Sequence, residues 1–245
     1  MARIDDLLRE CLGLLPPKPL DSESQSAKKA YSELISQKVA LALADELRYR
    51  GLQGARPAGA GDLGDSGAER RMAGGLGAKK VDVTWATEES GLLLAISVKT
   101  INFRDSRTKN FQKNLTNRRG DMLMEAVTLH RRFPYAVLAG MFFFDRGAET
   151  DGTGRRRSTV LNAHTRLRLF TGRDDPAGRE EQFERFYILS VDTEVSPPVV
   201  KAYAVGRPEQ EVHLGNLITE LLELVVERNP DFYELTDDGN LTRAT

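Results

Sequence analysis

The spacing of apolar positions along the chain predicts five helices. They cover residues about 3–15, 26–50, 117–132, 158–170 and 214–228. Helical spacing is clearest in the second of them, which aligns Tyr31, Leu34, Ile35, Val39, Ala42, Leu43 and Leu47. The last is apolar over more than one stripe, which indicates either deep burial or a dimer interface.

Apolar runs predict five strands, at about 80–86, 92–100, 135–144, 185–192 and 199–205. The run at 135–144 is apolar almost throughout, which is typical of a central strand buried on both faces. A short polar turn separates the first two runs, so they form a hairpin or adjacent strands. This mixture of strands and helices predicts one α/β sandwich, a single domain over 1–245 with its core at about 26–205.

Two segments give no such pattern. Residues 51–78 are dense in glycine and predict a long functional loop without a helix or long strand. The tail from Asp237 is expected to be frayed.

Composition limits the kinds of site and partner that the chain can have. The net charge of -1 gives no global basic field that would indicate nucleic acid. One cysteine excludes an internal disulfide and favours a reducing compartment, and with three histidines it leaves too few ligands for a Cys/His zinc site. We find no signal peptide and no apolar run of about 20 residues, so we expect a soluble, cytoplasmic protein without a membrane.

Polar residues interrupt the first two apolar runs, where a buried strand should have none. Asp82 lies in the first, and Ser97 and Lys99 lie in the second. An isolated charge in such a place is costly unless it is paired or bound to a metal. Ser97 and Lys99 are two residues apart and share a face, while Val98 points the other way. A carboxylate beside a lysine at strand ends suits metal-assisted phosphodiester chemistry.

The order of these elements over residues 26–145 resembles the PD-(D/E)XK nuclease superfamily. Asp82 and Lys99 match two positions of its motif, whereas Ser97 replaces the expected carboxylate and Val81 replaces the proline. The resemblance implies a restriction-endonuclease-like three-layer sandwich, with a central mixed β-sheet flanked by helices. It also implies that Asp82 holds Mg²⁺, for which Mn²⁺ can substitute, and that Lys99 orients or activates the attacking water.

The neutral Ser97 leaves a carboxylate to be found elsewhere, because Mg²⁺ prefers anionic oxygen ligands. A subgroup of restriction endonucleases with Ser-Val-Lys recruits a glutamate from the following helix. Asp121 and Glu125 lie four residues apart on that helix, and we favour Glu125 because it sits further in, among apolar residues. Glu33 on the preceding helix is another candidate for the missing carboxylate. Alternatively, these three acids are ordinary solvated helix residues.

A basic stretch follows the second strand and is poor in acids. It is a candidate DNA contact because Lys and Arg bind phosphates, Arg reads guanine and Asn reads adenine. Its candidate residues are Arg104, Arg107, Lys109, Lys113, Asn114, Asn117, Arg118 and Arg119. Arg70 and Arg71 beside the glycines form a second candidate arm, and Arg155, Arg156 and Arg157 a third. The alternative for each is a solvated loop or linker.

The leading hypothesis is a Mg²⁺-dependent DNA endonuclease, a type II-like restriction or phage-defence enzyme. Its expected partners are DNA, a second copy of the chain, and a cognate methyltransferase or defence-system subunits. One alternative is a catalytically inactive nuclease-fold subunit that binds DNA or assembles a defence complex. Another is an unrelated α/β scaffold, in which Asp82 and Lys99 form a structural ion pair.

Overall fold

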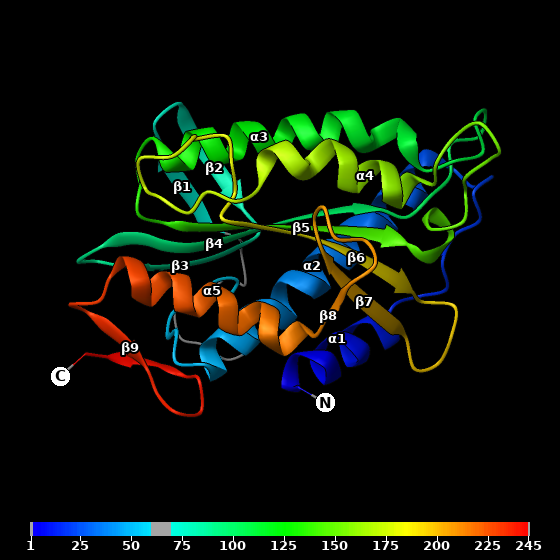
Figure 1. Ribbon diagram of the computed structural model, residues 1–245. Coiled ribbons are helices and arrows are strands. Elements are labelled where there is room, and N and C mark those ends of the chain that lie inside the picture. The colour runs from blue at the N-terminus through cyan, green and yellow to red at the C-terminus, as the bar shows by residue number, and fades with distance from the viewer. Residues whose placement is uncertain (1, 60–69, 245) are drawn as a thin grey trace.

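A central β-sheet lies between two layers of helices in the computed structural model, which describes residues 2–59 and 70–244 (Figure 1). The helices are α1 (Arg3–Gly13), α2 (Gln25–Tyr49), α3 (Leu115–His130), α4 (Thr159–Leu167) and α5 (Leu214–Arg228). The sheet contains β3 (Val83–Thr87), β4 (Gly91–Ile101), β5 (Val137–Asp145), β6 (Arg185–Asp192), β7 (Val199–Ala204) and β8 (Glu211–Val212). The predicted α/β architecture is confirmed, and the helix boundaries lie within about three residues of those predicted.

The six strands follow the order β3-β4-β5-β6-β7-β8. β4, β5 and β6 are parallel to one another, while β3, β7 and β8 pair antiparallel to their neighbours. The sheet is therefore mixed, with the run predicted as a central strand lying between two parallel partners.

Alternate residues of β5 enter two separate cores. Val137, Ala139, Met141 and Phe143 belong to the core beneath α1, α2 and α5. Leu138, Phe142 and Phe144 belong to the core beneath α3 and α4. Burial on both faces explains why this segment is apolar almost without interruption.

The glycine-rich segment was predicted to be a loop without a helix or long strand, but its second half contains short strands. It forms a hairpin of β1 (Arg70–Gly74) and β2 (Gly77–Val81), which lies against α3. Gly75 N donates to Thr128 O (2.8 Å), and a Cβ on Gly74 would collide with Thr128. The glycines thus permit close approach to the helix rather than a loop. Residues 60–69 lie outside the described residues.

The prediction that the tail is frayed from Asp237 is also wrong. β9 (Tyr233–Leu235) and β10 (Leu241–Arg243) form a hairpin that is held against the end of α2. Leu241 is buried and its N–H donates to Arg50 O (2.7 Å), while Arg50 Nε donates to Gly239 O (3.1 Å). These hydrogen bonds order a polar segment that has little apolar pattern of its own.

Deep burial, rather than an interface, accounts for the apolar surface of α5. Leu217, Leu221, Leu222 and Val225 have no exposed surface and pack in the core beneath the sheet. Among the described residues, no helix has the length and apolar character that crossing a bilayer requires.

Candidate active site

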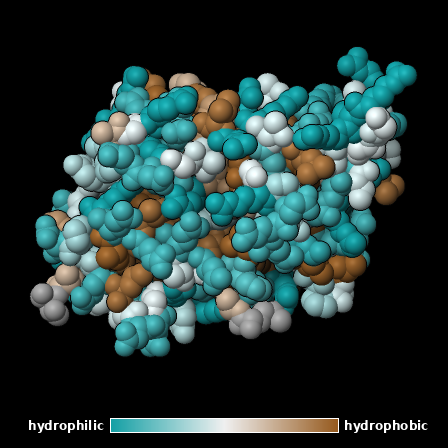
Figure 2. Space-filling model, in the orientation of Figure 1, coloured by the Kyte–Doolittle hydropathy of each residue, from teal (hydrophilic) through white to brown (hydrophobic). Residues whose placement is uncertain are grey.

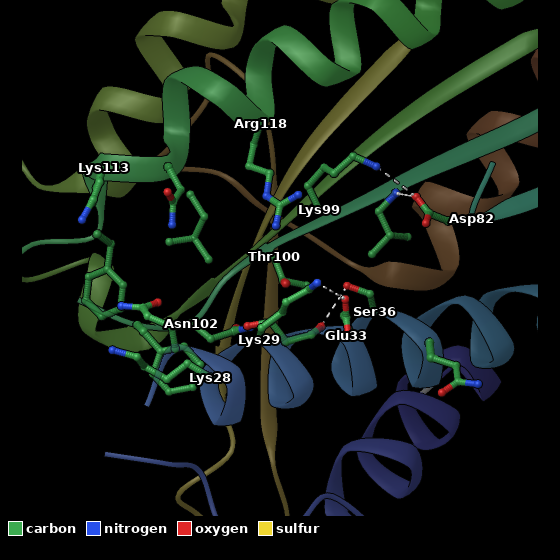
Figure 3. Close-up of a pocket in the computed structure, with 18 of the residues that line it drawn as sticks. Lys28, Lys29, Glu33, Ser36, Asp82, Lys99, Thr100, Asn102, Lys113 and Arg118 are labelled. Carbon is green, nitrogen blue, oxygen red and sulfur yellow. Dashed lines mark hydrogen bonds and ion pairs between the residues drawn. The ribbon is translucent and has the colours of Figure 1, made fainter. Parts of the chain in front are cut away.

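Three charged side chains from different elements meet at one end of β4. Lys99 lies in β4, and Glu125 lies in α3. Asp82 lies at the break between β2 and β3, so the prediction of one continuous strand over about 80–86 is wrong. Lys99 Nζ is 3.3 Å from Asp82 Oδ2 and 3.8 Å from Glu125 Oε2. Figure 3 shows Lys99 extending toward Asp82. The ammonium group therefore lies between two carboxylates.

The beginning of β3, directly after Asp82, determines the position of this carboxylate. β3 pairs with β4 only as far as Ile96, whereas β4 continues to Ile101. Beyond Ile96 the backbone of β4 lacks the neighbouring strand on this side, and Asp82 Oδ2 accepts a hydrogen bond from Val98 N (2.7 Å). An unpaired backbone N–H is costly when buried, so this contact fixes the carboxylate beside Lys99.

Lys99 remains a cation in this environment. Burial alone would lower its pKa, but the carboxylates of Glu125 and Asp82 outweigh that effect, and the pKa of Lys99 is raised. Lys99 is thus a fixed positive charge rather than a proton acceptor.

Glu125 is the unusual member of the group. Its side chain is only 8% exposed. Burial raises the pKa of Glu125 to about 7, Lys99 opposes the rise, and Asp82 adds to it. The carboxyl group therefore changes between its protonated and ionised forms close to neutral pH.

Ser97 lies beneath the same three residues, on the face of β4 that is turned toward α3. As expected from strand alternation, Val98 points to the opposite core. The Ser97 hydroxyl is close enough to Glu125 to lower the pKa of that carboxyl group. Ser97 Oγ is buried and has no other hydrogen-bond partner within the described residues.

Three of these residues carry the kind of oxygen atom that would hold a small divalent cation. Asp82 Oδ1 accepts no hydrogen bond within the described residues, and Glu125 and Ser97 offer further hard oxygen atoms. No cluster of three or more His, Cys, Asp or Glu side chains suited to a metal occurs in the described part of the chain. Mg²⁺ commonly uses one or two carboxylates together with water and substrate phosphates, so two carboxylates suffice.

The other predicted carboxylates are less well situated. Glu33 lines the same cleft from α2, but its side chain is 67% exposed and pairs with Lys29 at 3.7 Å (Figure 3). Asp121 is exposed on α3 and is not among the residues that line the cleft. Of the three acids considered for the second carboxylate, only Glu125 contacts Lys99; its role as a ligand stays a prediction.

A cleft of about 780 Å³ lies between α2, α3 and the end of β4. Asp82 and Lys99 line it, whereas Glu125 and Ser97 lie behind them and are not among its lining residues. Acids are outnumbered on its walls, where the charged residues are Glu33, Asp82 and Asp105 against Lys28, Lys29, Lys80, Lys99, Arg104, Lys113 and Arg118. Figure 3 shows Lys28 and Lys29 on one wall and Lys113 and Arg118 on the other. The excess of cations favours an anionic ligand.

The predicted DNA contacts divide into three groups. Arg104, Lys113, Asn114 and Arg118 line the cleft. Arg107, Lys109 and Asn117 are exposed outside it, and Arg119 stacks over the Phe170 ring at 5.7 Å. The side chains of Arg70 and Arg71 lie outside the described residues.

Apart from Glu33, the α2 wall of the cleft was not predicted from the sequence. Its polar residues recur at helical spacing, opposite the apolar face of the helix, and they are Gln25, Lys28, Lys29, Ser32, Glu33, Ser36 and Gln37. This stripe is itself a signal, because a long helix with one buried face and one regular polar face can line a binding site. Asn102 at the end of β4 joins the two walls by donating to Ser32 Oγ (3.1 Å).

Comparison with known proteins gives no match to a protein-family model, a curated protein or a solved structure.

Proposed function

We propose that this chain is a Mg²⁺-dependent DNA endonuclease with a restriction-endonuclease-like fold. The observation that supports it most is the Lys99 ammonium group, which lines a basic cleft together with Asp82 and also pairs with the buried Glu125. Phosphodiester hydrolysis needs a cation near the phosphate, ligands for a metal ion and a surface that binds the nucleic-acid backbone. One cleft offers all three.

The architecture agrees with this proposal. A mixed sheet lies between helical layers, and the site draws on α2, on the antiparallel pair β3 and β4, and on α3, with the β1–β2 hairpin between α2 and β3 in the chain. The departure from the family motif at Ser97 is compensated by Glu125, which approaches the same lysine from α3.

The chemistry follows from the charges. Asp82 and Glu125 would hold Mg²⁺, which when bound polarises the scissile phosphate and lowers the pKa of water. Lys99 keeps its proton, so its role is to stabilise the negative charge that grows on the phosphate and to orient the attacking water. The cations of the cleft walls bind flanking phosphates.

A break in both strands of a duplex requires two such sites, which a homodimer would provide. We propose a type II-like restriction or phage-defence role. The partners that it implies are a cognate methyltransferase or other defence-system subunits.

Cleavage of plasmid and phage DNA with Mg²⁺ or Mn²⁺ tests the proposal. We expect Lys99→Ala to reduce the rate by about 10²-fold or more, because it removes a charge that acts in the transition state. Lys201→Ala, an exposed lysine on β7, is the matched control and should cleave normally. Salt-sensitive binding without cleavage by the unmodified protein would instead favour the inactive DNA-binding or assembly subunit.

A further inference from the structure

Two basic segments of the chain contain no acidic residue. They are 106–120 and 152–173, in a protein with 36 Asp and Glu among 245 residues. The first contains five Lys and Arg residues and the second contains six arginines. The first includes the DNA contacts already considered, and the second includes Arg155, Arg156 and Arg157.

Asp151 joins the two segments. Its side chain is 1% exposed, and Oδ2 accepts a hydrogen bond from Phe111 N (3.0 Å) in the first segment. Oδ1 accepts from Thr159 N (2.7 Å) in the second, where Arg156 also donates to the Asp151 carbonyl oxygen. One buried carboxylate therefore holds the loop after β4 against the loop before α4.

Asp105 orders the first loop in a similar way. Its Oδ1 accepts from Arg107 N (3.1 Å) and Thr108 N (2.9 Å), while Lys113 Nζ lies 2.6 Å from Oδ2. Pairing with Lys113 and these N–H donors lowers the pKa of Asp105. The acid is turned inward, whereas Arg107 and Lys109 on the same loop are exposed.

The second loop is a tight turn that presents cations outward. Thr153 N donates to Arg156 O (2.8 Å) and Arg156 N donates to Thr153 O (3.1 Å). Arg155 lies at its tip, and both Arg155 and Arg157 are exposed. Figure 1 shows both loops at the end of the sheet toward which β5 points, and Figure 2 shows hydrophilic residues at the projecting tip of that end.

From this arrangement we infer that the exposed side chains of Arg107, Lys109, Arg155 and Arg157 form one phosphate-binding surface for double-stranded DNA that extends beyond the cleft. We call these four residues the basic ridge. The inference rests on the proposed function, because the cleft would hold the scissile phosphate and the ridge the flanking duplex. The ridge is continuous with the cleft, since Phe111 and Lys113 line the cleft and bond to the two ordering acids. Asp151 acts as a positioning residue.

Binding of a duplex of about 30 base pairs, measured by fluorescence anisotropy in EDTA over a series of salt concentrations, tests the ridge. Each phosphate contact contributes about 0.9 to the slope of log K against log salt concentration. We expect the double variant Arg155→Ala with Arg157→Ala to reduce that slope by about 2 and to weaken binding at every sequence. A slope equal to that of the unmodified protein would overturn the inference.

Arginines elsewhere on the surface provide a control for the loss of two charges. Arg179 and Arg243 are 61% and 66% exposed and pair with Glu181 and Glu89. The double variant Arg179→Ala with Arg243→Ala should keep the slope. An equal fall in slope would show a general charge effect and would also overturn the ridge.

Asp151→Asn tests whether Asp151 positions the basic ridge, because a positioning role and a simple loss of charge predict opposite changes in DNA affinity. Removing a negative charge should by itself tighten DNA binding, as we expect for exposed Asp237→Asn. An amide at position 151 would direct an N–H toward the N–H of Phe111 or Thr159, so we expect weaker binding and a smaller slope. Unchanged or tighter binding by folded Asp151→Asn would overturn this positioning role; if this variant does not fold, the arginine variants decide.

Two outcomes distinguish failure of the basic ridge proposal from failure of the nuclease proposal. Salt-dependent binding that needs Arg155 and Arg157, in a protein that cuts no DNA with Mg²⁺, would support the ridge and overturn the nuclease. Mg²⁺-dependent cleavage with an unchanged binding slope in the ridge variant would support the nuclease and overturn the ridge.

Discussion

Burial makes ionisation of Glu125 unfavourable for the stability of the folded chain. Glu125 is buried beside another carboxylate, and its pKa of about 7 means that ionisation is less favourable in the folded chain than in the unfolded chain. A group with this property is typical of sites where charge is needed for a ligand rather than for stability. Two predictions follow from it at the scale of the single residue.

The first concerns stability without metal. Between an ordinary pKa of 4.5 and about 7, folded Glu125 binds more protons than unfolded Glu125, so its contribution to stability falls as the pH rises through this window. Glu125→Gln removes this effect and should stabilise the protein in EDTA by up to about 3 kcal/mol at pH 8, but by less than about 1 kcal/mol at pH 5. Thermal melting at both pH values measures it. A variant less stable than the unmodified protein at pH 8 would contradict this account of Glu125.

The second concerns metal. A cation at Glu125 must displace the proton, so metal affinity should fall as the pH drops below about 7. Mg²⁺ or Mn²⁺ should therefore raise the melting temperature more at pH 8 than at pH 6, and Glu125→Gln should abolish the rise. Glu33→Gln, on the exposed wall of the cleft, serves as the control and should retain it.

Asp82, Ser97 and Lys99 could be predicted from sequence because a charge or hydroxyl in an apolar run breaks a simple pattern. The choice between Asp121 and Glu125 could not be settled in that way. Both lie on one side of α3, and only the packing of that helix on β4 turns Glu125 inward. The hydrogen bond from Val98 to Asp82 could not be predicted either, because it depends on where β3 begins to pair with β4.

At the scale of elements, the spacing of apolar residues was enough to predict the helices and strands that are buried in a regular pattern. α2, β5 and α5 each bury a continuous face or both faces, and their predicted limits hold. The two hairpins were missed for a shared physical reason. β1–β2 and β9–β10 are short and largely polar, and they are ordered by contacts with α3 and α2 rather than by their own pattern.

A buried ionic cluster joins several elements at a distance from the cleft. Glu184 precedes β6 with no exposed surface, and it lies 2.8 Å from Arg173, 2.7 Å from Arg228 at the end of α5, and 3.3 Å from His130 at the end of α3. Burial would raise the pKa of Glu184, but His130, Arg228 and Leu138 N outweigh it, so the pKa is lowered. The carboxylate is thus ionised and depends on its partners.

Arg228→Met should therefore destabilise the protein by about 3–5 kcal/mol, because it removes one partner of a buried charge while conserving much of the side-chain volume. Urea unfolding measures the loss. The exposed Arg179→Met should change stability by less than about 1 kcal/mol. An equally small effect for Arg228→Met would show that the cluster does not support the junction of α3, α5 and the sheet.

At the scale of the whole molecule, the order of helices and strands was enough to predict a layered α/β protein. It was not enough to predict which loops meet. The joining of 106–120 to 152–173 through Asp151 depends on a single buried side chain between segments 40 residues apart, which no local pattern encodes. The same is true of the cleft, which exists because α2 and α3 lie on opposite faces of β4 beyond its pairing with β3.

The central claim is that Glu125 supplies, from α3, the carboxylate that Ser97 lacks. The most direct test is the rate of Mg²⁺-dependent plasmid cleavage by Glu125→Ala and by the double variant Ser97→Glu with Glu125→Ala. We predict that the single variant loses activity by about 10²-fold or more, and that moving the carboxylate to the strand restores part of it, since the space left by Glu125 accepts the new side chain. Cleavage by Glu125→Ala at the rate of the unmodified protein would contradict the claim.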